Sequence, residues 1–172
     1  ALVNYLNNIY KTNYFPEHIT DYAVHKVLSK DVEEYNRVVE KFDKEKIGEL
    51  PTIDGAKEGV AALSTRYNLV VITARPHWLE EATMEWLEDN FGDAFSCVEF
   101  SRQRHNKEFP TKAENCKKHS VIAHVEDAPH HALDIARVTN VLLMDMPYNQ
   151  GIEHKNIRRV KDWGEVVDLL SK

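Results

Sequence analysis

The first indication of the fold is the stretch Leu69-Val70-Val71-Ile72-Thr73-Ala74-Arg75-Pro76. A second stretch of the same kind is Val121-Ile122-Ala123-His124-Val125-Glu126-Asp127-Ala128-Pro129. Short apolar runs that end on polar residues are typical of parallel strands buried on both faces. The two runs are therefore expected to bring a hydroxyl group, a cation and two acids to one edge of a sheet.

The rest of the chain supports this reading. Residues 1–50 follow a helical pattern, broken near Pro16, and from Ile53 onward helical and strand-like segments alternate. Strands are expected at 69–73, 95–100, 121–125 and 141–144, and helices after Gly55 and over 79–91, 112–119, 130–137 and 163–170. Such alternation predicts an α/β fold with a parallel sheet covered by helices on both faces. We expect a three-layer, Rossmann-like core over residues 51–172 and a small helical cap over residues 1–50, together forming one compact protein.

Composition narrows the range of functions. The 172 residues carry a net charge of −6, which disfavours nucleic acids and anionic membranes as partners. The one basic segment, Lys155 to Lys161, is interpreted as a solvated loop leading into the last helix. No apolar run approaches the ~20 residues that span a bilayer. Cys97 and Cys116 are expected to be reduced thiols, and the protein is expected to be cytoplasmic.

Ligands of open α/β sheets bind at the carboxyl ends of the strands, where Thr73, Arg75, Glu126, Asp127 and Asp145 are expected. The Thr73 hydroxyl and the neighbouring loop amides could bind an anion, although Thr73 could equally be an ordinary strand end. Arg75 could hold a phosphate through two hydrogen bonds or pair with a surface acid.

Glu126 and Asp127 form the stronger signal, because two adjacent acids after a buried strand need a compensating positive charge. Mg²⁺, which prefers oxygen ligands, would supply it. The alternative is that the acids cap the helix after Pro129. His124, His130 and His131 lack a second group of ligands at zinc spacing, so they are interpreted as surface or supporting residues.

These motifs together resemble the haloacid dehalogenase superfamily, in particular its 5'(3')-deoxyribonucleotidase-like branch. The segment around Thr73 is similar to the family's second motif, which holds the transferring phosphoryl group. Lys112, 14 residues before Glu126, is similar to the third-motif lysine, and Glu126-Asp127 to the magnesium-binding fourth motif. More branch-specific similarities, over about residues 1–170, are Pro51 to Ala56, Glu85-Trp86-Leu87, Met146 to Asn149 and Arg159 to Trp163.

The resemblance implies a function and a mechanism. The complete protein would be a magnesium-dependent phosphomonoesterase for a (deoxy)nucleoside monophosphate or a similar small phosphorylated metabolite. Thr73, Ala74, Arg75 and Lys112 would bind the phosphoryl group, with Thr73 and Lys112 catalytic, and Asp127 with Glu126 would bind the metal. Substrate selection is expected from the cap, with Tyr22, His25 and Tyr148 as candidates.

One part of the family pattern is missing. The family begins with a strand ending in Asp-x-Asp, whose first Asp is the nucleophile, and no Asp-x-Asp occurs in these 172 residues. Without that central strand, the strands of Thr73 and Asp127 would flank a gap with unpaired backbone groups. Either a leading segment of the natural protein is absent here, which we favour, or the chain is a noncatalytic phosphate-binding or scaffold protein. In both cases the chain as given is expected to be inactive.

Overall fold

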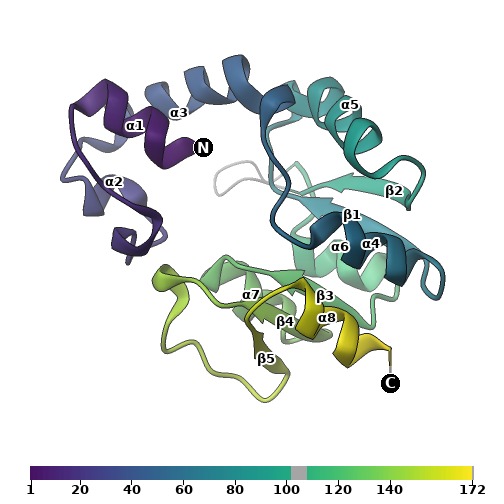
Figure 1. Cartoon of the computed structure of the whole chain (residues 1–172). Coiled ribbons are helices and arrows are strands. Elements are labelled where there is room, and N and C mark those ends of the chain that lie inside the picture. Colours follow the sequence, from purple (N-terminus) through teal and green to yellow (C-terminus); the bar gives the residue numbers. More distant parts are fainter. Residues whose placement is uncertain (102–107, 172) are drawn as a thin grey trace.

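The computed structural model describes residues 1–101 and 108–171. The N-terminal part is helical and lies to one side of the strands, in purple and blue (Figure 1). It consists of α1 (Leu2–Tyr10), a 3-10 turn η1 (Pro16–His18), α2 (Val24–Val27), α3 (Val32–Lys46) and η2 (Ile47–Glu49).

The remainder alternates between helices and strands. In chain order these are α4 (Ala56–Ser64), β1 (Leu69–Thr73), η3 (His77–Leu79), α5 (Glu80–Phe91), β2 (Phe95–Phe100), α6 (Lys112–Lys118), β3 (Ala123–Glu126), α7 (Pro129–Ile135), β4 (Asn140–Met144), η4 (Pro147–Asn149), β5 (Ile157–Val160) and α8 (Trp163–Leu170). This is the α/β class expected from the sequence.

The strands form two sheets rather than one. β1 pairs with β2, and β3, β4 and β5 form a second sheet in that order, with every pairing parallel. In the described residues β1 and β3 each have one strand partner, so each presents an unpaired backbone edge. The gap expected beside Thr73 and Asp127 is therefore present.

Two hydrophobic cores lie on opposite faces of β4, because successive side chains of a strand point to opposite sides. Val141 and Leu143 belong to the core formed with α6 and α7. Leu142 and Met144 belong to the core formed with α4, β5 and α8. Since both faces of β4 are covered, the architecture has three layers, as the sequence predicted.

The two strands β1 and β2, which are rich in apolar residues, begin and end at the predicted residues. The interpretation of the basic segment Lys155 to Lys161 as a solvated loop was wrong, because this segment contains the strand β5. Ile157 and Val160 face inward while Arg158 is exposed. A short strand at the edge of a sheet needs few apolar residues, so the charged residues of this segment made a strand there hard to predict from the sequence.

The N-terminal helices are joined to the α/β part by specific contacts. Asp31 caps the start of α3, and its carboxylate accepts the backbone N–H groups of Glu33 and Glu34 at 3.0 Å each. α3 then leads through η2 to Leu50, whose carbonyl accepts the indole N–H of Trp86 at 2.7 Å. This bond ties the end of the helical part to α5.

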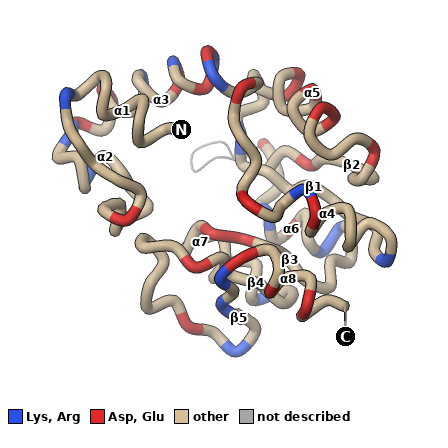
Figure 2. Tube along the Cα trace, in the orientation of Figure 1, with Lys and Arg blue, Asp and Glu red and all other residues tan. Residues whose placement is uncertain are grey.

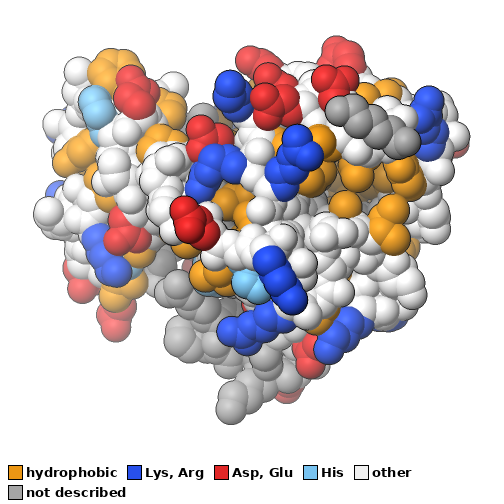
Figure 3. Space-filling view, turned by 90° about the horizontal axis from the view of Figure 1, so that it is seen from below, with side chains coloured by type: hydrophobic (Ala, Val, Ile, Leu, Met, Phe, Trp, Pro, Cys, Tyr) orange, Lys and Arg blue, Asp and Glu red, His pale blue; other side chains and the backbone are white. Residues whose placement is uncertain are grey.

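Charges of both signs are spread along the trace, and the acidic residues of α5 form the densest group (Figure 2). Seen from below, hydrophobic side chains gather on one part of the surface, bordered by charged ones (Figure 3). Among the described residues, no helix is long and apolar enough to span a bilayer.

We expect Gly59→Ala to destabilise the protein. A Cβ at position 59 would lie 2.8 Å from Cε3 of Trp163, so the contact between α4 and α8 would have to open. Overpacking of this kind costs about 1–3 kcal/mol, which exceeds the gain of up to about 1 kcal/mol in helix propensity. The measurement is urea unfolding followed by tryptophan fluorescence.

Gly48→Ala is the matched control, because no atom lies within 4 Å of a Cβ placed there. Its unfolding midpoint should not fall. A Gly59→Ala protein as stable as the wild type would contradict the close packing of Trp163 on α4.

Candidate phosphate and metal site

Thr73 is the last residue of β1, and its polar groups organise the loop that follows. Its hydroxyl oxygen accepts the backbone N–H of Arg75 at 3.1 Å, and its carbonyl accepts the N–H of Ser101 at 2.7 Å. The backbone therefore turns away from the strand immediately after Thr73, which places the Ala74 and Arg75 amides at the carboxyl end of β1.

The side chain of Arg75 lies against α5. Its guanidinium donates to Thr83 Oγ1 at 3.4 Å and lies 5.4 Å from the centre of the Trp86 ring. Burial lowers the pKa of Arg75, while the charge of Asp43 on α3 opposes that shift. In this arrangement Arg75 connects the β1 loop with α5 and the end of α3.

Lys112 is the first residue of α6, and the helix start is well defined. Thr111 accepts the N–H of Glu114 at 3.1 Å, and the Glu114 carboxylate accepts the N–H of Thr111 at 2.7 Å, a reciprocal capping box. The Lys112 side chain is only 12% exposed, and Nζ lies 2.6 Å from Oε2 of Glu126. The predicted spacing of 14 residues thus corresponds to a direct ion pair.

Glu126 ends β3 and is buried. Its Oε1 accepts the N–H groups of Asp127 and Ala128 at 3.0 and 3.1 Å, while Oε2 pairs with Lys112 and lies 3.6 Å from His124 Nε2. Burial opposes ionisation, but these hydrogen bonds and charges hold the pKa of Glu126 well below its usual range. Both carboxylate oxygens already have protein partners.

Asp127 is in a different environment. Its Oδ2 accepts a short hydrogen bond from the Tyr148 hydroxyl, and no salt bridge reaches it from the described residues. Burial raises the pKa of Asp127, and the negative charge of Glu126 raises it further. Burial and the bond to Asp127 also raise the pKa of Tyr148. Asp127 is thus a carboxylate whose charge has not been neutralised.

A fully buried amide holds the loop below Asp127. Asn149 donates to the carbonyls of Asp127 and Met144 at 2.8 Å each, and its Oδ1 accepts from Arg159 at 2.7 Å. Arg159 also pairs with Asp145 at 2.8 Å. Asp145 directly follows β4, as predicted, but its carboxylate is exposed and forms an ion pair with Arg159.

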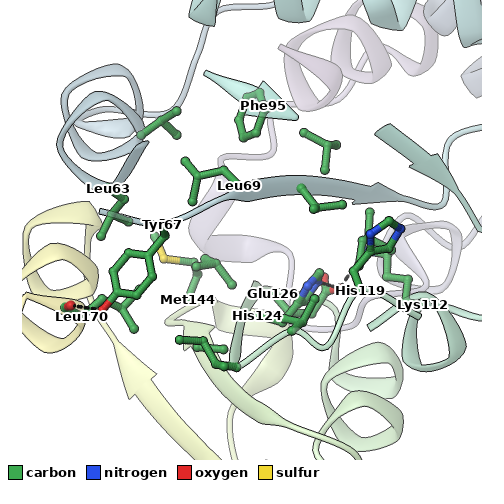
Figure 4. Close-up of a pocket in the computed structure, with 18 of the residues that line it drawn as sticks. Leu63, Tyr67, Leu69, Phe95, Lys112, His119, His124, Glu126, Met144 and Leu170 are labelled. Carbon is green, nitrogen blue, oxygen red and sulfur yellow. Dashed lines mark hydrogen bonds and ion pairs between the residues drawn. The ribbon is translucent and has the colours of Figure 1, made fainter. Parts of the chain in front are cut away.

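A cavity of about 790 Å³ lies between the facing edges of β1 and β3. Figure 4 shows Leu69 of β1 above it, Met144 below it, and Lys112, His124 and Glu126 at one end. Apolar side chains from α4, α8 and both sheets line most of it, and Asp127 and Tyr148 also belong to its lining.

The structure therefore brings together three of the predicted residues, Lys112, Glu126 and Asp127. Thr73, Ala74 and Arg75 lie at the end of β1 and are not among the residues lining the cavity. Lys107, the lysine that precedes Lys112 in the sequence, lies outside the described residues. His124 is partly buried, and its Nε2 lies 3.6 Å from Oε2 of Glu126.

Sequence reasoning did not identify the role of Asn149 or the contact of Tyr148 with Asp127. Both residues stand in the segment Met146-Pro147-Tyr148-Asn149, whose resemblance to the family's closing segment was the available signal. The segment gave no indication of its partners, because Tyr148 and Asp127 are 21 residues apart.

We expect Lys112→Met to lower the free energy of unfolding by about 3–5 kcal/mol, because the substitution leaves Glu126 buried without its cation. The double variant Lys112→Met, Glu126→Gln should recover part of the loss. Chemical denaturation measures both. Lys118→Met is the control, since Lys118 pairs with Glu99 but is 61% exposed, and it should change stability by less than about 1 kcal/mol. Equal effects at positions 112 and 118 would contradict a special role for the buried pair.

Stability should also fall between about pH 6.5 and pH 4 because of His131. Burial, with the charges of Lys112 and His130, lowers the pKa of His131 to about 4. An unfolded histidine binds a proton near pH 6.5, so in this window the unfolded state binds more protons than the native state. The contribution of neutral His131 to the free energy of unfolding is therefore fully present above pH 6.5, and it is lost as the pH falls toward 4. Thermal unfolding of His131→Gln should show a flatter pH profile than wild type, and an unchanged profile would contradict this role of His131.

Comparison with known proteins places this geometry in a family. The family model for 5' nucleotidase, deoxy (pyrimidine), cytosolic type C protein matches residues 1–172. A nucleotidase of Clostridium acetobutylicum is 28% identical over 99% of this chain and 85% of its own length. Putative nucleotidases of Halalkalibacterium halodurans and Bacillus subtilis are each 29% identical, over 94% and 99% of this chain and 80% and 86% of their own lengths.

Among solved structures, a haloacid dehalogenase-like hydrolase from Streptococcus pneumoniae superposes with a TM-score of 0.67. The superposition covers 97% of this chain and 87% of that one, at 14% identity, so it supports the fold. The match of the family model over the whole chain is the stronger finding, and by it the protein belongs to the family of 5' nucleotidases, deoxy (pyrimidine), cytosolic type C.

Proposed function

We propose that the protein is a magnesium-dependent phosphomonoesterase that acts on a (deoxy)nucleoside monophosphate. The observation that carries the proposal is the combination of a buried Lys112–Glu126 pair with an uncompensated Asp127 at the carboxyl end of β3. A buried cation and a carboxylate without an ion-pair partner among the described residues lie close together there, in a chain that belongs to a nucleotidase family, and this supports phosphate binding by Lys112 and metal binding by Asp127.

The residues present fit Mg²⁺, with Asp127 as the principal ligand. Asp127 offers hard oxygen donors, and a cation there would offset the burial and the neighbouring negative charge of Glu126, which raise the pKa of Asp127. Glu126 would position Lys112 and the loop, since hydrogen bonds occupy both its oxygens. When bound, Mg²⁺ would neutralise the phosphoryl oxygens and so favour nucleophilic attack.

We assign phosphoryl binding to Thr73, Lys112 and the amides of Ala74 and Arg75. Lys112 would share its charge between Glu126 and the phosphoryl oxygens, which suits its low exposure. The Thr73 hydroxyl would donate to the phosphoryl group while its oxygen continues to accept from the Arg75 N–H. The Arg75 side chain would support this loop from its place against Trp86 and Thr83.

The cavity between β1 and β3 is the proposed location of the strand that carries the nucleophile. β1 pairs in parallel with β2, and β3 pairs in parallel with β4, so one further strand in the cavity would extend both sheets if it paired in parallel with each free edge. Its carboxyl end would lie beside Lys112 and Asp127. By itself, the 172-residue chain would bind phosphate without hydrolysing its esters, because no residue is assigned to attack phosphorus.

Residues 1–50 would act as the cap that closes the site and selects the substrate. The Tyr22 ring, between η1 and α2, lies 5.1 Å from the His130 ring and 5.7 Å from the Tyr148 ring. These aromatic groups connect the helical part with the loop beside Asp127. Their faces could hold the planar base of a nucleotide.

A noncatalytic phosphate-binding protein is the second candidate, because Lys112 and Asp127 could bind a phosphate and a metal ion without any nucleophile. Native N-terminal sequence distinguishes the two candidates, because only the enzyme requires a preceding strand with that motif.

The function is tested by joining to Ala1 an apolar strand that ends in Asp-x-Asp. We expect the extended chain to hydrolyse deoxynucleoside monophosphates with added Mg²⁺, and the 172-residue chain to release no phosphate. Asp127→Asn in the extended chain should raise the Mg²⁺ concentration needed for half-maximal rate, because it removes the charge that attracts the metal. Released phosphate is the measurement.

The control is the same extension with the first Asp of the added pair replaced by Asn, which should be inactive. Magnesium-dependent turnover by the 172-residue chain would show that another acid is the nucleophile, with Asp145 the nearest by strand position. Activity in the Asn control would have the same meaning.

A further inference from the structure

A second group of polar side chains lies on the outer strand of the smaller sheet. Cys97 and Glu99 alternate along β2 and therefore point to the same face. His119 follows α6 and meets them there: its Nε2 lies 2.7 Å from Glu99 Oε1, and Cys97 Sγ lies 4.0 Å from each ring nitrogen. Donor atoms of the three residues lie within 4.8 Å of one another.

The group is accessible and charged. The side chains of Glu99 and His119 are 18% and 22% exposed, and Cys97 is half-buried and free of any disulfide. Hydrogen bonds from Lys118 and His119 lower the pKa of Glu99, which is therefore a carboxylate. An ion could reach the three residues from solvent.

We propose that Cys97, Glu99 and His119 form a binding site for a first-row transition metal ion, with Zn²⁺ as the best fit. A thiolate, an imidazole and a carboxylate are the ligand types that Zn²⁺ takes, and a thiolate disfavours Mg²⁺. With Zn–S near 2.3 Å and Zn–N near 2.1 Å, sulfur and nitrogen can be about 4.4 Å apart at most, so 4.0 Å is within reach of one ion. Small rotations of the side chains would complete the geometry and leave the fourth position for water.

The site has a structural consequence for the region around Lys112. His119 follows the last turn of α6, and Lys112 is its first residue, roughly 10 Å away along the helix. A bound ion would fix the end of α6 to β2. His119 also belongs to the lining of the cavity between β1 and β3. Zinc would therefore stiffen the helix that presents Lys112.

Lys118 separates this proposal from a purely structural cluster of charges. Its Nζ lies 2.7 Å from the same Glu99 oxygen that His119 contacts, and its side chain is 61% exposed. If the three residues serve only to form ion pairs, removing Lys118 should weaken their mutual contacts and should not strengthen Zn²⁺ binding. If it binds a metal, Lys118 competes for Glu99, so its removal should tighten binding.

The test uses the metal-free 172-residue chain and titrates it with Zn²⁺ by calorimetry and with Co²⁺ by absorption. We expect one saturable site, a rise in the thermal midpoint with Zn²⁺, and a thiolate-to-cobalt charge-transfer band. Cys97→Ser should abolish the band and weaken Zn²⁺ binding at least ten-fold, and His119→Gln should weaken it similarly. Lys118→Ala should bind Zn²⁺ more tightly than wild type.

Cys116→Ser is the matched control, because Cys116 is the other cysteine but is buried in the core of α6 and α7. It should keep the cobalt band and the Zn²⁺ affinity. A band that survives Cys97→Ser, or that disappears in Cys116→Ser, would overturn the assignment. So would the absence of saturable binding in the wild type, or a Lys118→Ala protein that binds Zn²⁺ more weakly.

Discussion

The burial of Glu126 is the constraint on which the rest of the site depends. A carboxylate at 5% exposure must be matched by donors and a cation, and here two backbone amides and Lys112 supply them. Because Lys112 is the first residue of α6, this pair positions the helix against β3. Apolar residues of α6 then join Ile72 of β1 and Leu143 of β4 in one core. The ion pair thus joins α6 to β3, and the apolar core joins α6 to β1 and β4.

The ion pair between Lys112 and Glu126 also explains why the two adjacent acids, Glu126 and Asp127, are assigned different roles. Glu126 receives a cation and two amides, so its pKa falls. Asp127 is buried beside the negative charge of Glu126, and both effects raise its pKa, while the hydrogen bond from Tyr148 opposes the shift. Neighbouring carboxylates in different environments commonly take different roles. This is the physical basis for assigning the metal to Asp127 and the structural role to Glu126.

The open edges of β1 and β3 explain why the molecule holds a large apolar cavity at its centre. Parallel strands are normally buried among neighbours, and exposed edges invite pairing with another strand. The cavity is bounded on one side by β1 and on the other by β3, with α4 and α8 contributing apolar side chains. Its end lies beside Lys112 and Asp127, where chemistry is proposed.

The sequence by itself determined the class of fold and the bounds of β1 and β2, because periodicity is a local property of the chain. The meeting of Lys112 with Glu126 was expected only from the resemblance of their spacing to the family's motifs. Tertiary structure alone decided what depends on contacts between distant segments. Only in the tertiary structure does the basic segment form strand β5 beside β4. The same holds for the contacts of Tyr148 and Asn149 with Asp127, and of His119 with Cys97. Those partners are separated by about twenty residues, and only packing determines which polar groups meet once apolar surfaces are buried.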